Sequence, residues 1–175
     1  METRRAKIIS GKAGGTASSG SVTYKISLPS SWVKQLDNNE VTLSFDGSRI
    51  TITPRQTMEG FLSSRLSEGH KITVIHYYNF DYLCSLIYAD NTTREIIVEN
   101  YTDSWINTAL GKNDSPSWDD LEEFLEERCI PRTRAGLKHY LNAIGLVEYD
   151  PWDIVRKTQG RMAEDDQWLE IEELR

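Results

Sequence analysis

The stretch that decides the fold begins with residues 25–29, Lys25-Ile26-Ser27-Leu28-Pro29, and continues through Ser30 to Leu36. It ends with residues 41–47, Val41-Thr42-Leu43-Ser44-Phe45-Asp46-Gly47, and residues 50–54, Ile50-Thr51-Ile52-Thr53-Pro54. Apolar and polar side chains alternate from residue 22 to residue 28, which predicts a half-buried strand that Pro29 ends. Asp46-Gly47 between two alternating runs predicts a β-hairpin. The order is therefore strand, proline, short helix, turn and hairpin.

The flanking residues set the boundaries of this segment. Lys7-Ile8-Ile9 predicts a short first strand, and the Gly- and Ser-rich residues 11–20 predict a flexible loop. Phe61, Leu62 and Leu66 at helical spacing predict a linking helix over residues 57–69. We therefore expect a small unit at 1–56, a linker helix at 57–69 and a second domain at 70–175.

Charge is distributed unevenly between these parts. Eight Lys and Arg against four Asp and Glu give residues 1–56 a charge of +4, and because the whole chain carries −7, residues 57–175 carry −11. Opposite charges on two segments indicate two units with different partners.

Residues 25–54 resemble the centre of the AbrB/MazE-like swapped-hairpin family, in which an Ile-Thr-Ile-Pro-type strand precedes a short helix and a hairpin. The resemblance covers about a third of the chain, with a longer, Gly-richer loop and with Tyr24 where the family often has Gly. It implies a homodimer that closes one swapped-hairpin β-barrel and binds double-stranded DNA. The matching positions are Lys7, Lys25 and Lys34, and Arg4, Arg5 and Lys12 would add reach.

Phosphate neutralisation would be the mechanism of this binding. Each Lys or Arg that contacts a phosphate releases a counterion, so binding should weaken steeply with salt. The alternative is that the +4 segment is a solvated surface and that the unit serves dimerisation alone.

The rest of the chain predicts an α+β fold. Strands are expected at residues 71–78, 82–88 and 95–101, as an antiparallel meander. Helices are expected at 118–128, where Ser117 and Asp120 form a capping-box-like start, at 133–144, and from Pro151 to near Gly160. The expected fold class is thus a dimeric swapped-hairpin β-barrel, then a small meander and a C-terminal helical bundle, with residues 162–174 as an acidic tail.

Residues 117–171 are similar to an uncharacterised domain seen in bacterial mobile elements and toxin–antitoxin-like gene clusters, which implies a context and no mechanism. Acidic runs alternate here with Arg and Lys, which is typical of solvated helices with internal salt bridges. The sharper interpretation is an acidic docking surface for a basic protein, either a toxin or a nucleic-acid-binding effector. The residues expected to form it are Glu123, Glu127, Glu164, Asp165, Asp166 and Trp168.

No catalytic motif emerges from the sequence. The spacing of the three histidines, His70, His76 and His139, is not that of metal ligands, and the sequence has no phosphate-binding loop motif. Cys84 and Cys129 are expected to be reduced, half-buried thiols. Asp119, Asp120 and Glu123 would be the acids of a nuclease, but carboxylates on a helix surface carry little weight. We expect no enzyme, cofactor or metal. With no long apolar run and no signal core, we expect a cytoplasmic protein without membrane contact.

The leading hypothesis is a dimeric DNA-binding transcription regulator of antitoxin or autorepressor type, with an acidic partner-binding C-terminal domain. The alternative is a phage or mobile-element inhibitor of a nucleic-acid-binding defence effector, such as an anti-CRISPR, that acts through the acidic surface and has auxiliary DNA binding.

Overall fold

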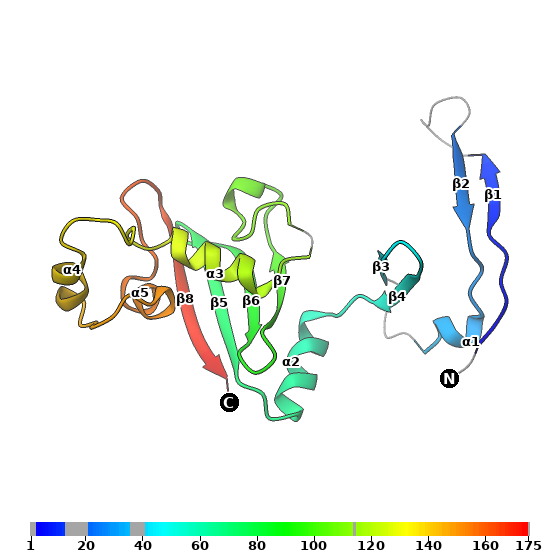
Figure 1. The fold of residues 1–175 in the computed structure, drawn as a ribbon, viewed down its shortest axis with the longest axis horizontal. Coiled ribbons are helices and arrows are strands. Elements are labelled where there is room, and N and C mark those ends of the chain that lie inside the picture. Colours follow the sequence, from blue (N-terminus) through cyan, green and yellow to red (C-terminus); the bar gives the residue numbers. More distant parts are fainter. Residues whose placement is uncertain (1–2, 13–20, 36–40, 114, 175) are drawn as a thin grey trace. The chain divides into compact units, whose positions relative to one another are not determined.

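The computed structural model describes residues 3–12, 21–35, 41–113 and 115–174 (Figure 1). The chain divides into two units, residues 1–55 and residues 56–175. Most of the Gly- and Ser-rich loop, residues 13–20, and residues 36–40, where the turn between the short helix and the hairpin is expected, lie outside the described residues.

The first hairpin of the N-terminal unit pairs β1 (Ile9–Lys12) with β2 (Val22–Lys25) in antiparallel register. Pro29 then caps the short helix α1 (Ser30–Val33) with extended backbone, at φ −59° and ψ 134°. A proline preorganises the start of a helix because its missing N–H is not needed there. The predicted order of strand, proline and short helix is confirmed.

The second hairpin pairs β3 (Val41–Phe45) with β4 (Ile50–Pro54). The Asp46 carboxylate accepts hydrogen bonds from the backbone N–H of Ser48 at 2.9 Å and of Arg49 at 2.8 Å, and these bonds lower the pKa of Asp46. Gly47 has φ +93°, which a residue with a Cβ rarely adopts. The Asp46-Gly47 hairpin is therefore confirmed, with a physical reason for both residues.

The expected swapped-hairpin β-barrel is wrong. In the described part of the N-terminal unit, β1–β2 and β3–β4 are two separate two-stranded sheets. A closed barrel needs every strand to pair on both sides, whereas each of these strands pairs on one side. Alternating side chains indicate that a strand has one apolar face, but they do not say which strand lies beside it.

The C-terminal unit is built on a four-stranded antiparallel sheet in the order β7-β6-β5-β8 (Figure 1). The strands are β5 (Ile72–Asn79), β6 (Tyr82–Asp90), β7 (Glu95–Asn100) and β8 (Gln167–Leu174). The predicted meander of the first three strands is confirmed, with a register shift between Tyr77 and Tyr78. The helix α2 (Met58–Ser67), which was expected as a linker, belongs to this unit and packs against β5, β6 and β7.

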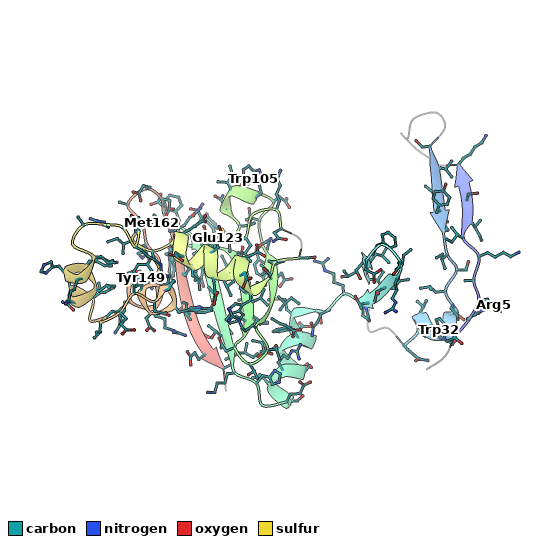
Figure 2. The ribbon with its side chains drawn as sticks, viewed as in Figure 1. Arg5, Trp32, Trp105, Glu123, Tyr149 and Met162 are labelled. Atoms are coloured by element: carbon teal, nitrogen blue, oxygen red, sulfur yellow. The ribbon has the colours of Figure 1, made fainter. Side chains whose placement is uncertain are left out.

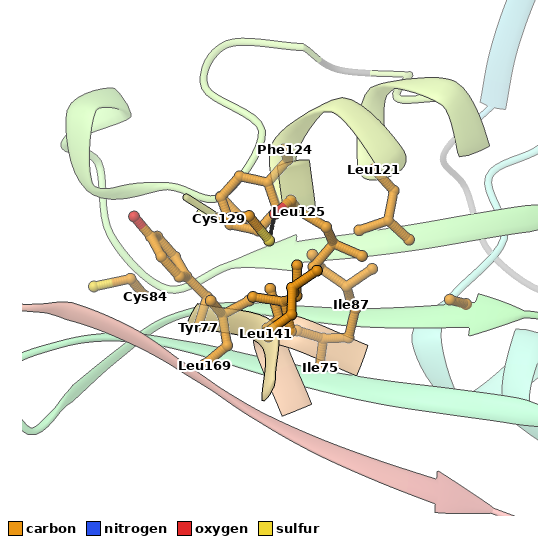
Figure 3. Close-up of a cluster of buried hydrophobic side chains, with 14 residues drawn as sticks. Ile75, Tyr77, Cys84, Ile87, Leu121, Phe124, Leu125, Cys129, Leu141 and Leu169 are labelled. Carbon is orange, nitrogen blue, oxygen red and sulfur yellow. Dashed lines mark hydrogen bonds between the residues drawn. The ribbon is translucent and has the colours of Figure 1, made fainter. Parts of the chain in front are cut away.

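Helices cover the face of the sheet that carries Ile75 and Ile87 (Figure 3). The covering elements are the loop after the 3-10 turn η1 (Trp105–Asn107), through Ala109 and Leu110, and the helices α3 (Trp118–Glu127), α4 (Leu137–Ala143) and α5 (Pro151–Thr158). Phe124 packs edge-on against Tyr77, with ring centroids 5.3 Å apart. The predicted capping box is confirmed, since Ser117 and Asp120 exchange hydrogen bonds at the start of α3.

The expected C-terminal helical bundle is also wrong, because the unit is a sheet with α3, α4 and α5 on one face and its last element is the strand β8. Leu169 and Ile171 face the core, while Glu170 lies between them on the other face. This alternation has the period of a strand, and reading residues 162–174 only as an acidic tail overlooked it.

In the parts of the chain that the structure describes, no helix has both the length and the apolar character needed to cross a membrane.

Candidate functional site

The second hairpin has one wholly apolar face. Leu43 lies opposite Ile52 and Phe45 opposite Ile50, so these side chains share a face with Val41 and Pro54. Leu43 is 66% exposed and Phe45 is 69% exposed. The reverse face carries only hydroxyl side chains, from Thr42, Ser44, Thr51 and Thr53. A two-stranded hairpin is marginal in water, and a contiguous apolar face of this kind marks an interaction surface.

Both faces of the first hairpin, β1–β2, carry a lysine together with apolar side chains. Its register places Val22 and Tyr24 on one face and Lys25 with Ile9 on the other. Val22, Tyr24 and Ile9 are all exposed. Lys25 therefore lies on the face opposite to the one that carries Val22 and Tyr24.

The six predicted DNA-binding cations are all exposed, but they do not lie on one face. Lys25 is the last residue of β2 and pairs with Ile9, which follows Lys7 by two residues. Lys12 is the last residue of β1 and lies on the other face, with Val22. Three residues of strand rise separate Lys12 from Ile9, about 10 Å. Lys34 follows α1 as its C-cap. The remaining two cations, Arg4 and Arg5, precede β1 without helix or strand structure (Figure 2).

The acidic residues predicted to bind a partner are also distributed over several places. Asp165 forms a two-pronged ion pair with Arg128, at 2.6 and 2.9 Å, and this pair lowers the pKa of Asp165. Arg128 is buried and also donates to the backbone oxygens of Gly160 and Gln167. Asp165 therefore holds the loop before β8 in place and has its charge paired within the unit, although the residue is exposed.

The other five residues of that prediction lie on α3 and on residues 164–168, where Asp166 and Trp168 line one pocket. Glu123 and Glu127 are exposed on α3 (Figure 2), and Glu164 and Asp166 are exposed in the loop that precedes β8. Trp168 stacks on Tyr78 of β5 with ring centroids 4.4 Å apart, and its indole N–H donates to the backbone oxygen of Phe80 at 2.7 Å.

The structure shows a structural role for one of the acids considered for a nuclease. Asp120 accepts hydrogen bonds from the backbone N–H and the hydroxyl of Ser117, which lower its pKa and engage it in the helix cap. Within the described ranges, no three His, Cys, Asp or Glu side chains gather in a way that could hold a metal ion.

Sequence reasoning missed the second face of the sheet. Glu99 of β7 and Glu170 and Glu172 of β8 lie on the face away from the helices. The signal was the alternation of Glu170 and Glu172 with Leu169 and Ile171. Comparisons of the chain with protein-family models, with curated proteins and with solved structures found no match.

Proposed function

We propose that the protein is a homodimeric regulator that binds duplex DNA through its N-terminal unit and works in the cytoplasm. The observation that carries the proposal is the exposed apolar face of the β3–β4 hairpin, together with lysines on neighbouring elements of the same unit. The role is one of binding rather than catalysis.

Dimerisation follows from the cost of leaving that face in water. Six side chains, including Leu43 and Phe45, stand on one side of a hairpin whose other side is wholly polar. Burial of each such aliphatic or aromatic side chain contributes roughly 1.5–3 kcal/mol when it is complete. A second copy presents the same face, so an isologous contact covers both.

The proposal of DNA binding is supported by exposed cations that are not part of the β3–β4 face. Lys25 lies opposite the Val22 and Tyr24 face, and Lys34 lies in the turn that follows α1. A dimer presents each of them twice. Lysines placed in this way neutralise phosphates, so affinity depends steeply on salt.

The test is a titration of a generic duplex with the full-length protein, at low and at high salt. Replacing Lys25→Ala and Lys34→Ala together should weaken binding and lower the salt slope by about 0.9 for each phosphate that is no longer neutralised, or by up to about 4 per dimer. The matched control replaces Lys138→Ala and Lys157→Ala, which remove the same charge from exposed positions of the C-terminal unit.

Two outcomes contradict the proposal. One is an absence of binding at low salt. The other is a double lysine variant that binds DNA as the unchanged protein does. A protein that is dimeric yet does not bind DNA would reduce the role of the N-terminal unit to dimerisation.

A further inference from the structure

The helices of the C-terminal unit leave one face of its sheet partly exposed. The side chains of Ile75 and Ile87 point to the face that α3, α4 and α5 cover. Side chains at the alternate positions of each strand point the other way. We call that second surface the open face and define it by two rows of residues that run across the four strands.

Each row has a carboxylate at one or both edges and apolar or aromatic residues in the middle. In the first row, β7, β6, β5 and β8 contribute Glu99, Leu86, His76 and Glu170. In the second row, the same strands contribute Ile97, Tyr88, Val74 and Glu172. The two central strands thus form a floor of half-buried side chains around the buried Val74, and the two edge strands carry the acids.

Aromatic rings extend the floor toward the β5–β6 turn. Tyr78 stacks on Trp168 at 4.4 Å, and the His76 ring lies 6.3 Å from Tyr78 in a stacked orientation. The His76 Nδ1 atom is buried and has no hydrogen-bond partner in the described part of the molecule. The floor is therefore aromatic toward the β5–β6 turn and aliphatic at Leu86 and Val74.

The acids of the open face lack cationic partners. Glu99, Glu170 and Glu172 are exposed, and among the residues described none of them lies within ion-pair distance of a Lys, Arg or His. Glu99 accepts a hydrogen bond from the hydroxyl of Tyr101 at 2.7 Å, which does not neutralise its charge. Charges of one sign beside an apolar floor favour a ligand of the opposite sign.

The chain's own α2 shows the chemistry by which a helix contacts this face. Phe61 is buried, and the guanidinium of Arg65 lies over its ring, 5.6 Å from the centroid. Arg65 forms ion pairs with Asp90, at 3.5 Å, and with Glu95. Asp90 and Glu95 are cross-strand partners in the row next to the second row of the open face. The helix α2 thus packs at this end of the sheet with an aromatic ring and a cation among its contacts.

We propose that the open face binds an amphipathic helix of a partner protein, with Lys or Arg flanking its apolar stripe. The edge strands β7 and β8 are three strand spacings apart, about 14 Å, and an α-helix is about 10 Å across. Such a helix fits on the floor between the acids, with its apolar stripe on Leu86 and Tyr88 and its cations toward Glu99 and Glu172. This binding is independent of DNA binding by the N-terminal unit.

The test uses the full-length protein and a fluorescent peptide of about 18 residues, five helical turns of Leu and Lys designed as an amphipathic helix. Two further peptides serve as controls: one has the same composition without an apolar stripe, and the other has Glu in place of Lys. The open-face variant combines Glu99→Gln, Glu170→Gln and Glu172→Gln. Its matched control combines Glu123→Gln, Glu127→Gln and Glu164→Gln, which are exposed acids elsewhere on the unit.

Fluorescence anisotropy should show that the wild-type protein binds the amphipathic peptide and neither control peptide. Each exposed ion pair contributes roughly two- to threefold to affinity, so the open-face variant should bind about tenfold more weakly. The control variant should bind as the wild type does. A second substitution, Leu86→Ser, tests the floor and should also weaken binding.

Three results would overturn the proposal. The first is a wild-type protein that fails to bind the amphipathic peptide. The second is an equal loss of affinity in both triple variants, which would show that the peptide is attracted to any negative surface of the protein. The third is a Leu86→Ser variant whose oligomeric state differs from that of the wild type without peptide, which would make a second copy the occupant.

Discussion

Replacing Leu43→Ser should separate the two copies of the proposed dimer. Leu43 lies in the middle of the apolar face, opposite Ile52, and it is 66% exposed in the single chain. Its replacement therefore removes little packing within one chain. In a dimer that covers this face, the same side chain would be buried.

The magnitude follows from the exposed fraction. Complete burial of a leucine contributes roughly 1.5–3 kcal/mol, so burying the exposed two thirds contributes about 1–2 kcal/mol. A symmetric dimer buries Leu43 twice, which makes about 2–4 kcal/mol. The dimer dissociation constant should rise roughly 30- to 700-fold.

Sedimentation equilibrium over a series of protein concentrations measures this constant directly. Thr42→Ser is the matched control, because Thr42 is the neighbouring residue on the polar face of the same strand. A Leu43→Ser protein that associates as tightly as the wild type would refute the dimer through this face. A wild-type protein that is monomeric at every concentration would refute it equally.

Three further predictions concern the C-terminal unit. Burial of Asp90 opposes its charge, but hydrogen bonds from a histidine and from the turn that follows outweigh this effect and lower its pKa from 3.8 to about 2. The ionised Asp90 carboxylate therefore stabilises the fold above pH 4, and this stabilisation is lost as the pH falls toward 2. In denaturant titrations, the free energy of unfolding of Asp90→Asn should change less between pH 4 and pH 2 than that of the wild type. Gly160→Ala should lower the free energy of unfolding in urea by roughly 1–3 kcal/mol, because Gly160 has φ +56° and a Cβ would lie 2.4 Å from Leu169. Cys84 and Cys129 are buried, and burial raises the pKa of Cys129 to about 12, so neither should react with a thiol reagent until the protein unfolds.

Local structure was predictable wherever neighbouring residues interact with one another. The Asp46 carboxylate binds the amides of its own turn, and Ser117 and Asp120 cap one helix end. In both cases, the partners lie within three residues along the chain. Because the interacting residues are so close in the sequence, the sequence pattern alone predicts the hydrogen bond.

Strand neighbours could not be predicted in the same way. β8 pairs with β5, so that His76 lies opposite Glu170 across 94 residues of sequence. The alternation around Glu170 would have indicated a strand, but nothing local assigns it to the outer edge beside β5. The barrel prediction failed for the same reason, because the hairpins β1–β2 and β3–β4 were each predictable while their further partners were not.

Charge was misleading where burial could not be read from the sequence. Asp165 and Asp166 are adjacent, acidic and exposed, yet Asp165 is paired with the buried Arg128. Glu170 and Glu172, which appeared only as part of an acidic tail, share one face of the sheet. A group of acids becomes a surface only once the register shows which of them lie on the same side.

The opposite charges of the two units also determine how the proposed DNA binding has to be measured. Residues 1–56 carry +4 and residues 57–175 carry −11, and both belong to one chain. The Debye length is about 30 Å in 0.01 M salt and about 8 Å at physiological ionic strength, so repulsion of DNA by the C-terminal unit grows as salt is lowered. The salt slope of the whole protein therefore sums an attraction and a repulsion. Only the difference in slope between the wild type and the Lys25 and Lys34 variant, with the C-terminal unit unchanged, reports how many phosphates these lysines neutralise.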